Sequence, residues 1–241
     1  MSEYARFDEP GNHEGVRELF DRTARTYDLL NHLFSFNIDS SWRKRLVRRS
    51  EAAPGSRVLD VCTGTGDVAL RFARSVKGTK VVALDFSPEM LGRIRSKVAS
   101  AGLQDRIEVV EGDALNLPFA DSSFDVVSNS FGLRTLERRE RALEEMTRVA
   151  KPGGRVLVME FLPPPRTLFG ALYSWHLNRF MPFLGTLLTA HRVSYSYLSD
   201  TVASFPSVDE ILRAMEHVGL ERLSYDRLTG GIAYLFYGRR A

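Results

Sequence analysis

The chain has 241 residues, 44% of them hydrophobic and 26% charged, a composition typical of one globular domain with a substantial core. Its formal net charge of +3 is too small to indicate nucleic-acid binding, and its single cysteine excludes an intrachain disulfide. No signal peptide is recognisable and no apolar run is long enough to span a bilayer, so we expect a cytoplasmic protein.

Two helices are predicted before the first strand. Apolar residues recur at helical spacing over residues 13–31, which indicates an amphipathic helix. The next helix carries five basic side chains: Arg43, Lys44, Arg45, Arg48 and Arg49. They form either a solvated face or a surface for anionic lipid headgroups, where each charge contributes roughly 1 kcal/mol. Trp42 is the only aromatic residue among them, which disfavours RNA binding.

Residues 58–67, VLDVCTGTGD, are the most informative stretch of the chain. An apolar run reaches Asp60, and Gly64 and Gly66 then form a loop that lets a ligand approach the backbone closely. In open α/β folds, such a loop binds nucleotides at the carboxyl edge of a parallel sheet. The spacing also fits G-x-G-x-x-G/A, so a dinucleotide and S-adenosylmethionine (SAM) are both open at this point. We interpret Cys62 as a packing residue rather than a nucleophile.

Acidic residues follow the next two predicted strands. Asp85 ends the strand over residues 80–85, where it either accepts a ribose hydroxyl pair or caps the helix that begins near Pro88. Asp113 follows the strand over residues 106–111 and is placed to accept the adenine amino group. The backbone N–H of Ala114 is placed to bind a ring nitrogen.

The second half of the chain continues the alternating pattern. A fourth strand is predicted over residues 124–129, and a turn at residues 151–154 leads into a fifth strand over residues 155–161. The insertion that follows is rich in large apolar residues and forms either core packing or a lid for a prenyl tail. Two final strands over residues 220–226 and 232–237 form a hairpin.

Four motifs, VLDVCTGTGD, ALDFSPEML, EGDALNLPF and RVAKPGGRVLVMEF, together resemble those of class I SAM-dependent methyltransferases. The resemblance implies an α/β, Rossmann-like fold with a seven-stranded, mostly parallel sheet and helices on both faces. We expect one domain in four parts: an N-terminal helical cap (about 12–50), a SAM-binding core (about 55–162), a helical lid (about 166–205), and a C-terminal helix and hairpin (about 207–241).

The flanking segments have a narrower resemblance, to the UbiE/MenG family of C-methyltransferases in menaquinone and ubiquinone biosynthesis. It rests on VRELFDRTARTYDLLNHLFSFNIDSSWRKRL near the N-terminus, SFGLR at residues 130–134, MPFLG at 181–185 and SYSYLSDTVASFP at 194–206. The loop, the strand ends and this resemblance imply a set of SAM-binding residues: Asp60, Gly64, Thr65, Gly66, Asp85, Asp113, Ala114 and Ser130. Two departures are Cys62-Thr63 before the loop, and AHRV at residues 190–193, where an acidic stretch is more usual.

The resemblance implies SAM-dependent C-methylation of a lipid-soluble prenylated quinol, with demethylmenaquinol favoured and a prenylated benzoquinol as the alternative. A ring carbon becomes nucleophilic when a neighbouring hydroxyl loses its proton, so the reduced quinol is required. Arg134 is the first candidate to stabilise the phenolate; its alternative role is an ion pair with a neighbouring acid. His176, Tyr195 and Tyr197 are weaker candidates, since lone His and Tyr residues more often pack.

The expected partners are this quinol and, transiently, the inner face of the membrane. No nucleic acid and no metal ion is expected, and a homodimer is an open alternative. An NAD-linked oxidoreductase is disfavoured because Asp113-Ala114 suits adenine in SAM and because no separate substrate domain is present.

Overall fold

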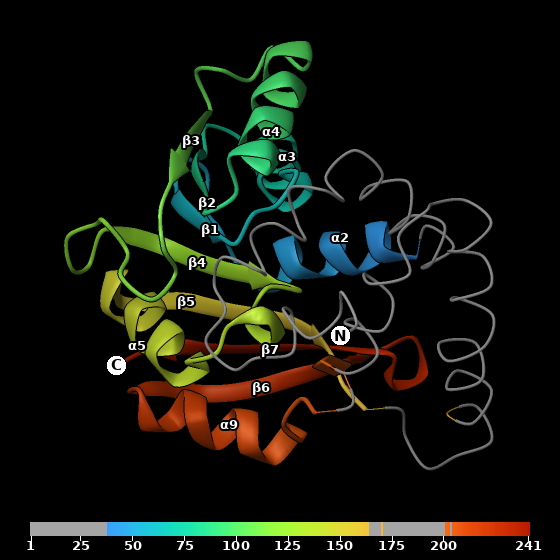
Figure 1. Ribbon diagram of the computed structural model, residues 1–241. Coiled ribbons are helices and arrows are strands. Elements are labelled where there is room, and N and C mark those ends of the chain that lie inside the picture. The colour runs from blue at the N-terminus through green and yellow to red at the C-terminus, as the bar shows by residue number, and fades with distance from the viewer. Residues whose placement is uncertain (1–37, 164–169, 171–200, 203) are drawn as a thin grey trace, which may run out of the picture.

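The computed structural model describes residues 38–163, 170, 201–202 and 204–241, which form one sheet between two layers of helices (Figure 1). The strand order is β3-β2-β1-β4-β5-β7-β6, and β7 alone runs against its neighbours. The strands are β1 (Arg57–Val61), β2 (Lys80–Asp85), β3 (Ile107–Glu111), β4 (Phe124–Ser130), β5 (Ala150–Phe161), β6 (Leu220–Leu228) and β7 (Ala233–Arg240). This confirms the predicted α/β fold, including its final antiparallel hairpin.

Helices cover both faces of the sheet, and each face has its own apolar core. Helices α2 (Asp39–Arg49), α3 (Asp67–Ser75) and α4 (Pro88–Ser100) pack on one face, while α5 (Arg139–Val149) and α9 (Val208–His217) pack on the other. Two short 3₁₀ helices, η2 (Leu133–Thr135) and η4 (Thr229–Gly231), follow β4 and β6. This burial on both faces explains the adjacent apolar residues at 58–59 in β1, 81–84 in β2 and 126–127 in β4.

The predicted turn at residues 151–154 lies inside β5 rather than before it. Phe124 of β4 pairs with Ala150, and the next pair along the ladder is Val126 with Arg155. The four residues between them bulge out of the ladder, and Gly153 takes a positive φ of 73° there. The strand therefore begins five residues earlier than the sequence pattern indicates.

Most of the basic residues of α2 bind acids of the protein itself. Arg43 pairs with Asp39 and lies 3.5 Å from Asp67. Arg45 and Arg49 both bind Asp226 of β6, at 2.6 and 2.7 Å. The expected solvated or lipid-binding face is therefore reduced to Lys44 and Arg48, which are exposed. The interpretation of all five charges as one surface was wrong, because the acidic partner Asp226 lies far along the chain.

Two predicted regions cannot be compared with the structure. The helix over residues 13–31 and nearly all of the insertion over residues 166–205 lie outside the described residues. Within the part of the chain that is described, no helix is both long enough and apolar enough to cross a membrane.

We predict that Asp226→Asn destabilises the fold in a pH-dependent way. Burial alone would raise the pKa of Asp226, but hydrogen bonds from Arg49 and Arg45 and their charges outweigh it and lower the pKa to about 2. The stabilisation is present above the ordinary pKa and is lost as the pH falls from about 4 to 2. With the arginines partly exposed, we expect a loss of about 1–2 kcal/mol at pH 7.

Thermal melting at pH 7 and at pH 3 measures this effect. The gap in melting temperature between wild type and Asp226→Asn should be clearly smaller at pH 3 than at pH 7. Asp105→Asn, at an exposed acid, is the matched control and should melt with wild type. A gap that stays constant across the pH range would contradict the ion-pair account.

Candidate functional site

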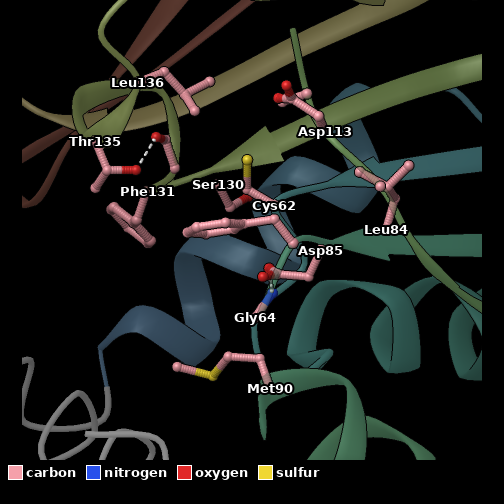
Figure 2. A pocket seen from close by; sticks show the side chains of 14 residues that line it. Cys62, Gly64, Leu84, Asp85, Met90, Asp113, Ser130, Phe131, Thr135 and Leu136 are labelled. Atoms are coloured by element: carbon pink, nitrogen blue, oxygen red, sulfur yellow. Dashed lines mark hydrogen bonds between the residues drawn. The ribbon is translucent and has the colours of Figure 1, made fainter. Parts of the chain in front are cut away.

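A pocket lies where the carboxyl ends of β1, β2 and β4 meet the turn after β3 (Figure 2). It is lined by Cys62, Gly64, Leu84, Asp85, Phe86, Met90, Gly112, Asp113, Ala114, Ser130, Phe131, Gly132, Thr135 and Leu136. The structure thus brings five of the predicted SAM-binding residues to one pocket: Gly64, Asp85, Asp113, Ala114 and Ser130. The other three, Asp60, Thr65 and Gly66, are not part of its lining.

Asp85 joins the end of β2 to the glycine loop. One carboxylate oxygen accepts the Gly64 N–H at 2.7 Å (Figure 2). The other accepts the Ser87 N–H at 3.1 Å. The residue that caps α4 is Ser87, whose side chain accepts the N–H of Met90. Asp85 therefore does not have the capping role considered for it. Each carboxylate oxygen can accept more than one hydrogen bond, so these contacts are compatible with a ribose diol.

The two glycines of the loop are explained by their left-handed backbone conformation and, at Gly66, also by close packing. Gly64 has a φ of 57°, and a Cβ there would meet open space beside the pocket. Gly66 has a φ of 86° and begins α3; a Cβ there would lie 2.2 Å from Ile94. Thr65 is buried, and its hydroxyl accepts a hydrogen bond from Lys97 of α4 at 3.1 Å. Its side chain therefore holds the loop against α4.

Asp60 is 1% exposed and ties the start of this loop to β4. Its carboxylate accepts hydrogen bonds from the hydroxyls of Thr63, at 2.6 Å, and Ser128, at 2.8 Å. Burial raises the pKa of Asp60 to about 6, although both hydroxyls act in the opposite direction. This acid lies behind the loop, where it shapes the pocket rather than lining it.

The pocket wall contains a polar atom that needs a partner. The Ser130 hydroxyl is buried and has no hydrogen-bond partner among the described residues. Opposite it, Asp113 is exposed and its carboxylate accepts the Leu115 N–H at 2.8 Å, which fixes the turn after β3. Ala114 is buried beside it. A ligand with both hydrogen-bonding ends and an apolar middle fits these surroundings.

Arg134 follows β4 in η2 and takes the alternative role considered from the sequence. Its guanidinium lies 3.1 Å from Glu160 of β5, and the two side chains are 8% and 0% exposed. The Arg134 N–H also binds Glu160, at 3.1 Å, and the guanidinium binds the Phe131 carbonyl. Arg134 does not line the pocket. Its Nε is buried with no hydrogen-bond partner among the described residues.

Several further residues were not predicted or cannot be placed. His176, Tyr195 and Tyr197 lie outside the described residues. Phe131, Thr135 and Leu136 line the pocket, although the sequence predicted none of them individually and pointed only to the SFGLR segment that contains or precedes them. Phe86 and Met90 also line the pocket. Their position shortly after Asp85 is the feature of the sequence that could have identified them. Burial, followed by the charges of Asp85 and Asp60, raises the pKa of Cys62, which supports its interpretation as an unreactive thiol.

The residues present fit SAM. An acid ends β2 where the sequence predicts a ribose site, a second acid follows β3, and a hydroxyl without a partner among the described residues ends β4. Gly112 allows the turn after β3 to pack closely against Leu84 of β2, since a Cβ there would lie 2.8 Å from the Leu84 side chain. With this sheet order and pocket, the protein has the class I SAM-dependent methyltransferase fold.

Comparison with known proteins supports this assignment, first by structure and then by sequence. A SAM-dependent methyltransferase from Aquifex aeolicus superimposes with a TM-score of 0.62 at 20% identity, covering 95% of this chain and 98% of its own. The phosphoethanolamine N-methyltransferase 2 of Haemonchus contortus, solved with SAM, gives 0.71 at 16% identity, covering 93% of this chain and 60% of its own. At these identities the likeness concerns the fold.

The family is established by sequence. Residues 9–240 match the ubiE/COQ5 methyltransferase family, and the chain belongs to it as a SAM-dependent methyltransferase. A Thermus thermophilus relative, named demethylmenaquinone methyltransferase, is 42% identical over 92% of this chain and 100% of its own. A Geotalea daltonii relative, named ubiquinone/menaquinone biosynthesis C-methyltransferase UbiE, is 41% identical over 94% and 97%.

We predict that Asp60→Asn stabilises the SAM-free protein at alkaline pH. Because the folded pKa of about 6 lies above the ordinary value, the carboxyl contributes full stability below about pH 4 and loses it as the pH rises through 6. An amide carries no charge to bury, so at pH 8 the free energy of unfolding should rise by roughly 2–3 kcal/mol. Denaturant unfolding at pH 8 and pH 4 measures this, and the gain should vanish at pH 4. An equal gain at both pH values would refute the buried charge as its cause.

Proposed function

We propose that this protein transfers a methyl group from SAM to a ring carbon of a prenylated quinol. Demethylmenaquinol, giving menaquinol, is the acceptor we favour, and a prenylated benzoquinol of ubiquinone synthesis is the alternative. The relatives named above for these activities support the reaction type, and their similar identities leave the choice of ring to experiment. The observation that carries the proposal is the pocket itself, whose wall after β4 contains Ser130, Phe131 and Gly132 of the SFGLR segment.

The chemistry divides between cofactor and protein. SAM supplies an electrophilic methyl group on a sulfonium. The acceptor hydroxyl gives up its proton, the ring carbon forms the new C–C bond as the S–C bond breaks, and that carbon then loses its hydrogen as a proton. Only the reduced ring has this electron density. The protein must hold the two reacting carbons in line, roughly 3–3.5 Å apart, and keep water away.

The chain's own residues divide these tasks. We propose that Asp85 accepts the ribose hydroxyls and that Asp113 with Ala114 binds adenine, which places the sulfonium toward Ser130. Apolar side chains of Leu84, Phe86, Met90 and Leu136 line the cavity between these polar groups and exclude water.

Arg134 remains our candidate for stabilising the phenolate. Its charge is matched by Glu160, and Nη1 is committed to Glu160 and the Phe131 carbonyl. Its Nε is buried and has no hydrogen-bond partner among the described residues, and Arg134 does not line the pocket, so we assign its effect on the phenolate to its charge across the Phe131 turn rather than to direct contact. A guanidinium keeps its charge at all relevant pH values, so it would act as an electrostatic donor rather than a base.

One assay tests the function. Purified protein is given radiolabelled SAM with a demethylated naphthoquinol, a benzoquinol, or the oxidised form of each. We expect label in the naphthoquinol and none in either oxidised ring. Preferential labelling of the benzoquinol would select the alternative substrate. Labelling of neither quinol, with SAM bound, would overturn the proposal.

We predict that SAM, and not NAD, binds the pocket and that Asp85→Ala weakens this binding. A hydrogen bond to a charged acceptor contributes roughly 1.5–3 kcal/mol, so SAM affinity should fall about ten- to a hundredfold. Calorimetric titration measures both cofactors. Asp121→Ala removes an exposed carboxylate far from the pocket and is the matched control. Unchanged affinity in folded Asp85→Ala would show that the acid serves only the loop and α4.

We predict that Arg134→Ala lowers methyl transfer per folded molecule by about 10²–10³ while SAM affinity stays near wild type. Arg134→Lys should recover part of the rate, because it keeps the charge but loses the planar fork. Removing Arg134 alone leaves Glu160 charged and buried, which by itself destabilises a fold by about 3–5 kcal/mol.

A second variant separates these effects. Arg134→Met combined with Glu160→Gln removes both charges together, so its folding loss should be smaller than that of Arg134→Ala. Single-turnover rates, melting temperatures and SAM affinities are measured on the same preparations. If the double variant transfers methyl groups at the wild-type rate, the phenolate role of Arg134 is wrong.

A further inference from the structure

The backbone of Phe131 is held in an unusual conformation. Its φ is 61°, a left-handed region that bulky side chains seldom adopt. Strain of this kind persists when surrounding contacts determine it, and it often marks a working part of a site. The Phe131 N–H binds the Met159 carbonyl at 2.8 Å, and its own carbonyl accepts from Arg134. The next residue is equally constrained, since a Cβ on Gly132 would lie 2.6 Å from Cys62.

The contact from Arg134 is itself held by a buried acid. Glu160 accepts hydrogen bonds from the Arg134 backbone and guanidinium, and from the Phe161 N–H at 3.1 Å. Burial raises the pKa of Glu160, while the charge of Arg134 opposes that rise. The Arg134–Glu160 pair thus connects β5 to the turn after β4. The closest backbone contact of the Arg134 guanidinium is the carbonyl of Phe131.

The result of these contacts is a fixed ring in the pocket wall. Figure 2 shows Phe131 with Thr135 and Leu136 on the side of the pocket away from Asp113 and Leu84. The Phe131 ring stacks on Phe161, with centroids 4.5 Å apart and planes inclined by 25°. Both rings are half-buried, so part of their surface remains accessible.

A third ring supports this stack from behind. The Trp42 centroid lies 6.2 Å from Phe131 and 6.0 Å from Phe161. The indole N–H of Trp42 binds the Thr229 hydroxyl at 2.9 Å, which fixes its orientation. The Phe131 ring in the pocket wall is therefore held in place by contacts with two further rings, Phe161 and Trp42.

We propose that the ring of Phe131, stacked on Phe161, is the platform on which the aromatic ring of the methyl acceptor lies, and that Glu160 and Arg134 are positioning residues which hold it. The inference rests on the proposed function, because the ribose and adenine ends assigned to Asp85 and Asp113 leave this wall for the reacting end. A flat ring gains most from an offset stack on another flat ring. The strained backbone of Phe131 is then explained by the placement of its side chain.

The test is binding of menadione, a flat naphthoquinone without a prenyl tail, to protein saturated with S-adenosylhomocysteine. Equilibrium dialysis measures its affinity without any methyl transfer. We expect Phe131→Leu to weaken menadione binding about three- to tenfold and Phe131→Tyr to stay within about twofold of wild type. S-adenosylhomocysteine affinity should change less than menadione affinity in both. Phe119→Leu changes a ring outside the pocket and is the matched control.

Two further variants are informative. One separates the effect of the Phe131 ring from that of its backbone strain, and the other tests whether Glu160 acts through that ring. Phe131→Gly relieves the left-handed strain and removes the ring, so it should bind menadione as weakly as Phe131→Leu. Glu160→Gln should weaken menadione binding in the wild-type background and add little in the Phe131→Leu background, because both changes act through one ring.

Several results would overturn the platform. These are unchanged menadione affinity in Phe131→Leu, wild-type affinity in Phe131→Gly, additive effects of Glu160→Gln and Phe131→Leu, an equal loss of S-adenosylhomocysteine affinity, or no menadione binding by wild type. Menadione binding that behaves as expected, in a protein that methylates no quinol, would instead refute the proposed function and leave the aromatic platform in place.

Discussion

Parallel pairing of β1 through β4 is the constraint on which the pocket depends. Val61 of β1 is level with Leu84 of β2 and Asn129 of β4, and Asp85 is level with Glu111 of β3. Strands that end level deliver the residues that follow them to one edge. The glycine loop, the acid of β2, the turn after β3 and the SFGLR turn meet there, although the first and the last of them lie more than sixty residues apart in the sequence.

Two buried acids connect the strands of this edge in different ways. Asp60 is balanced by the hydroxyls of Thr63 and Ser128, so its charged form is costly near neutral pH. Glu160 is balanced by a full positive charge, and hydrogen bonds from two backbone N–H groups complete its surroundings. The first acid holds the glycine loop against β4, and the second holds the turn after β4 against β5. The two walls of the pocket are therefore each tied to a neighbouring strand by a carboxylate.

The fold and much of the pocket could be predicted from sequence because their signals are local. A strand, a glycine loop and an acid at its end lie within a few residues, as around Asp60 and Asp85. The contacts that were missed join distant segments. Glu160 lies 26 residues after Arg134 in what looks like an ordinary core strand, and Asp226 lies 177 residues after Arg49. The charge pattern of α2 indicated a surface, since no local feature of the sequence marks the acid that neutralises it.

Helix α2 connects these distant contacts to the proposed chemistry. Arg45 and Arg49 bind Asp226 on the final hairpin, while Trp42 binds Thr229 at the tip of the same hairpin. Trp42 also supports the rings of Phe131 and Phe161. The antiparallel hairpin is thus connected, through one helix, to the pocket wall built by the parallel strands. The backing of the aromatic wall thus depends on α2, whereas the hydrogen bonds of Asp85 and Asp60 are made with residues of other elements. Arg43 of the same helix lies 3.5 Å from Asp67 at the start of α3, beside the glycine loop, so α2 contacts both walls of the pocket.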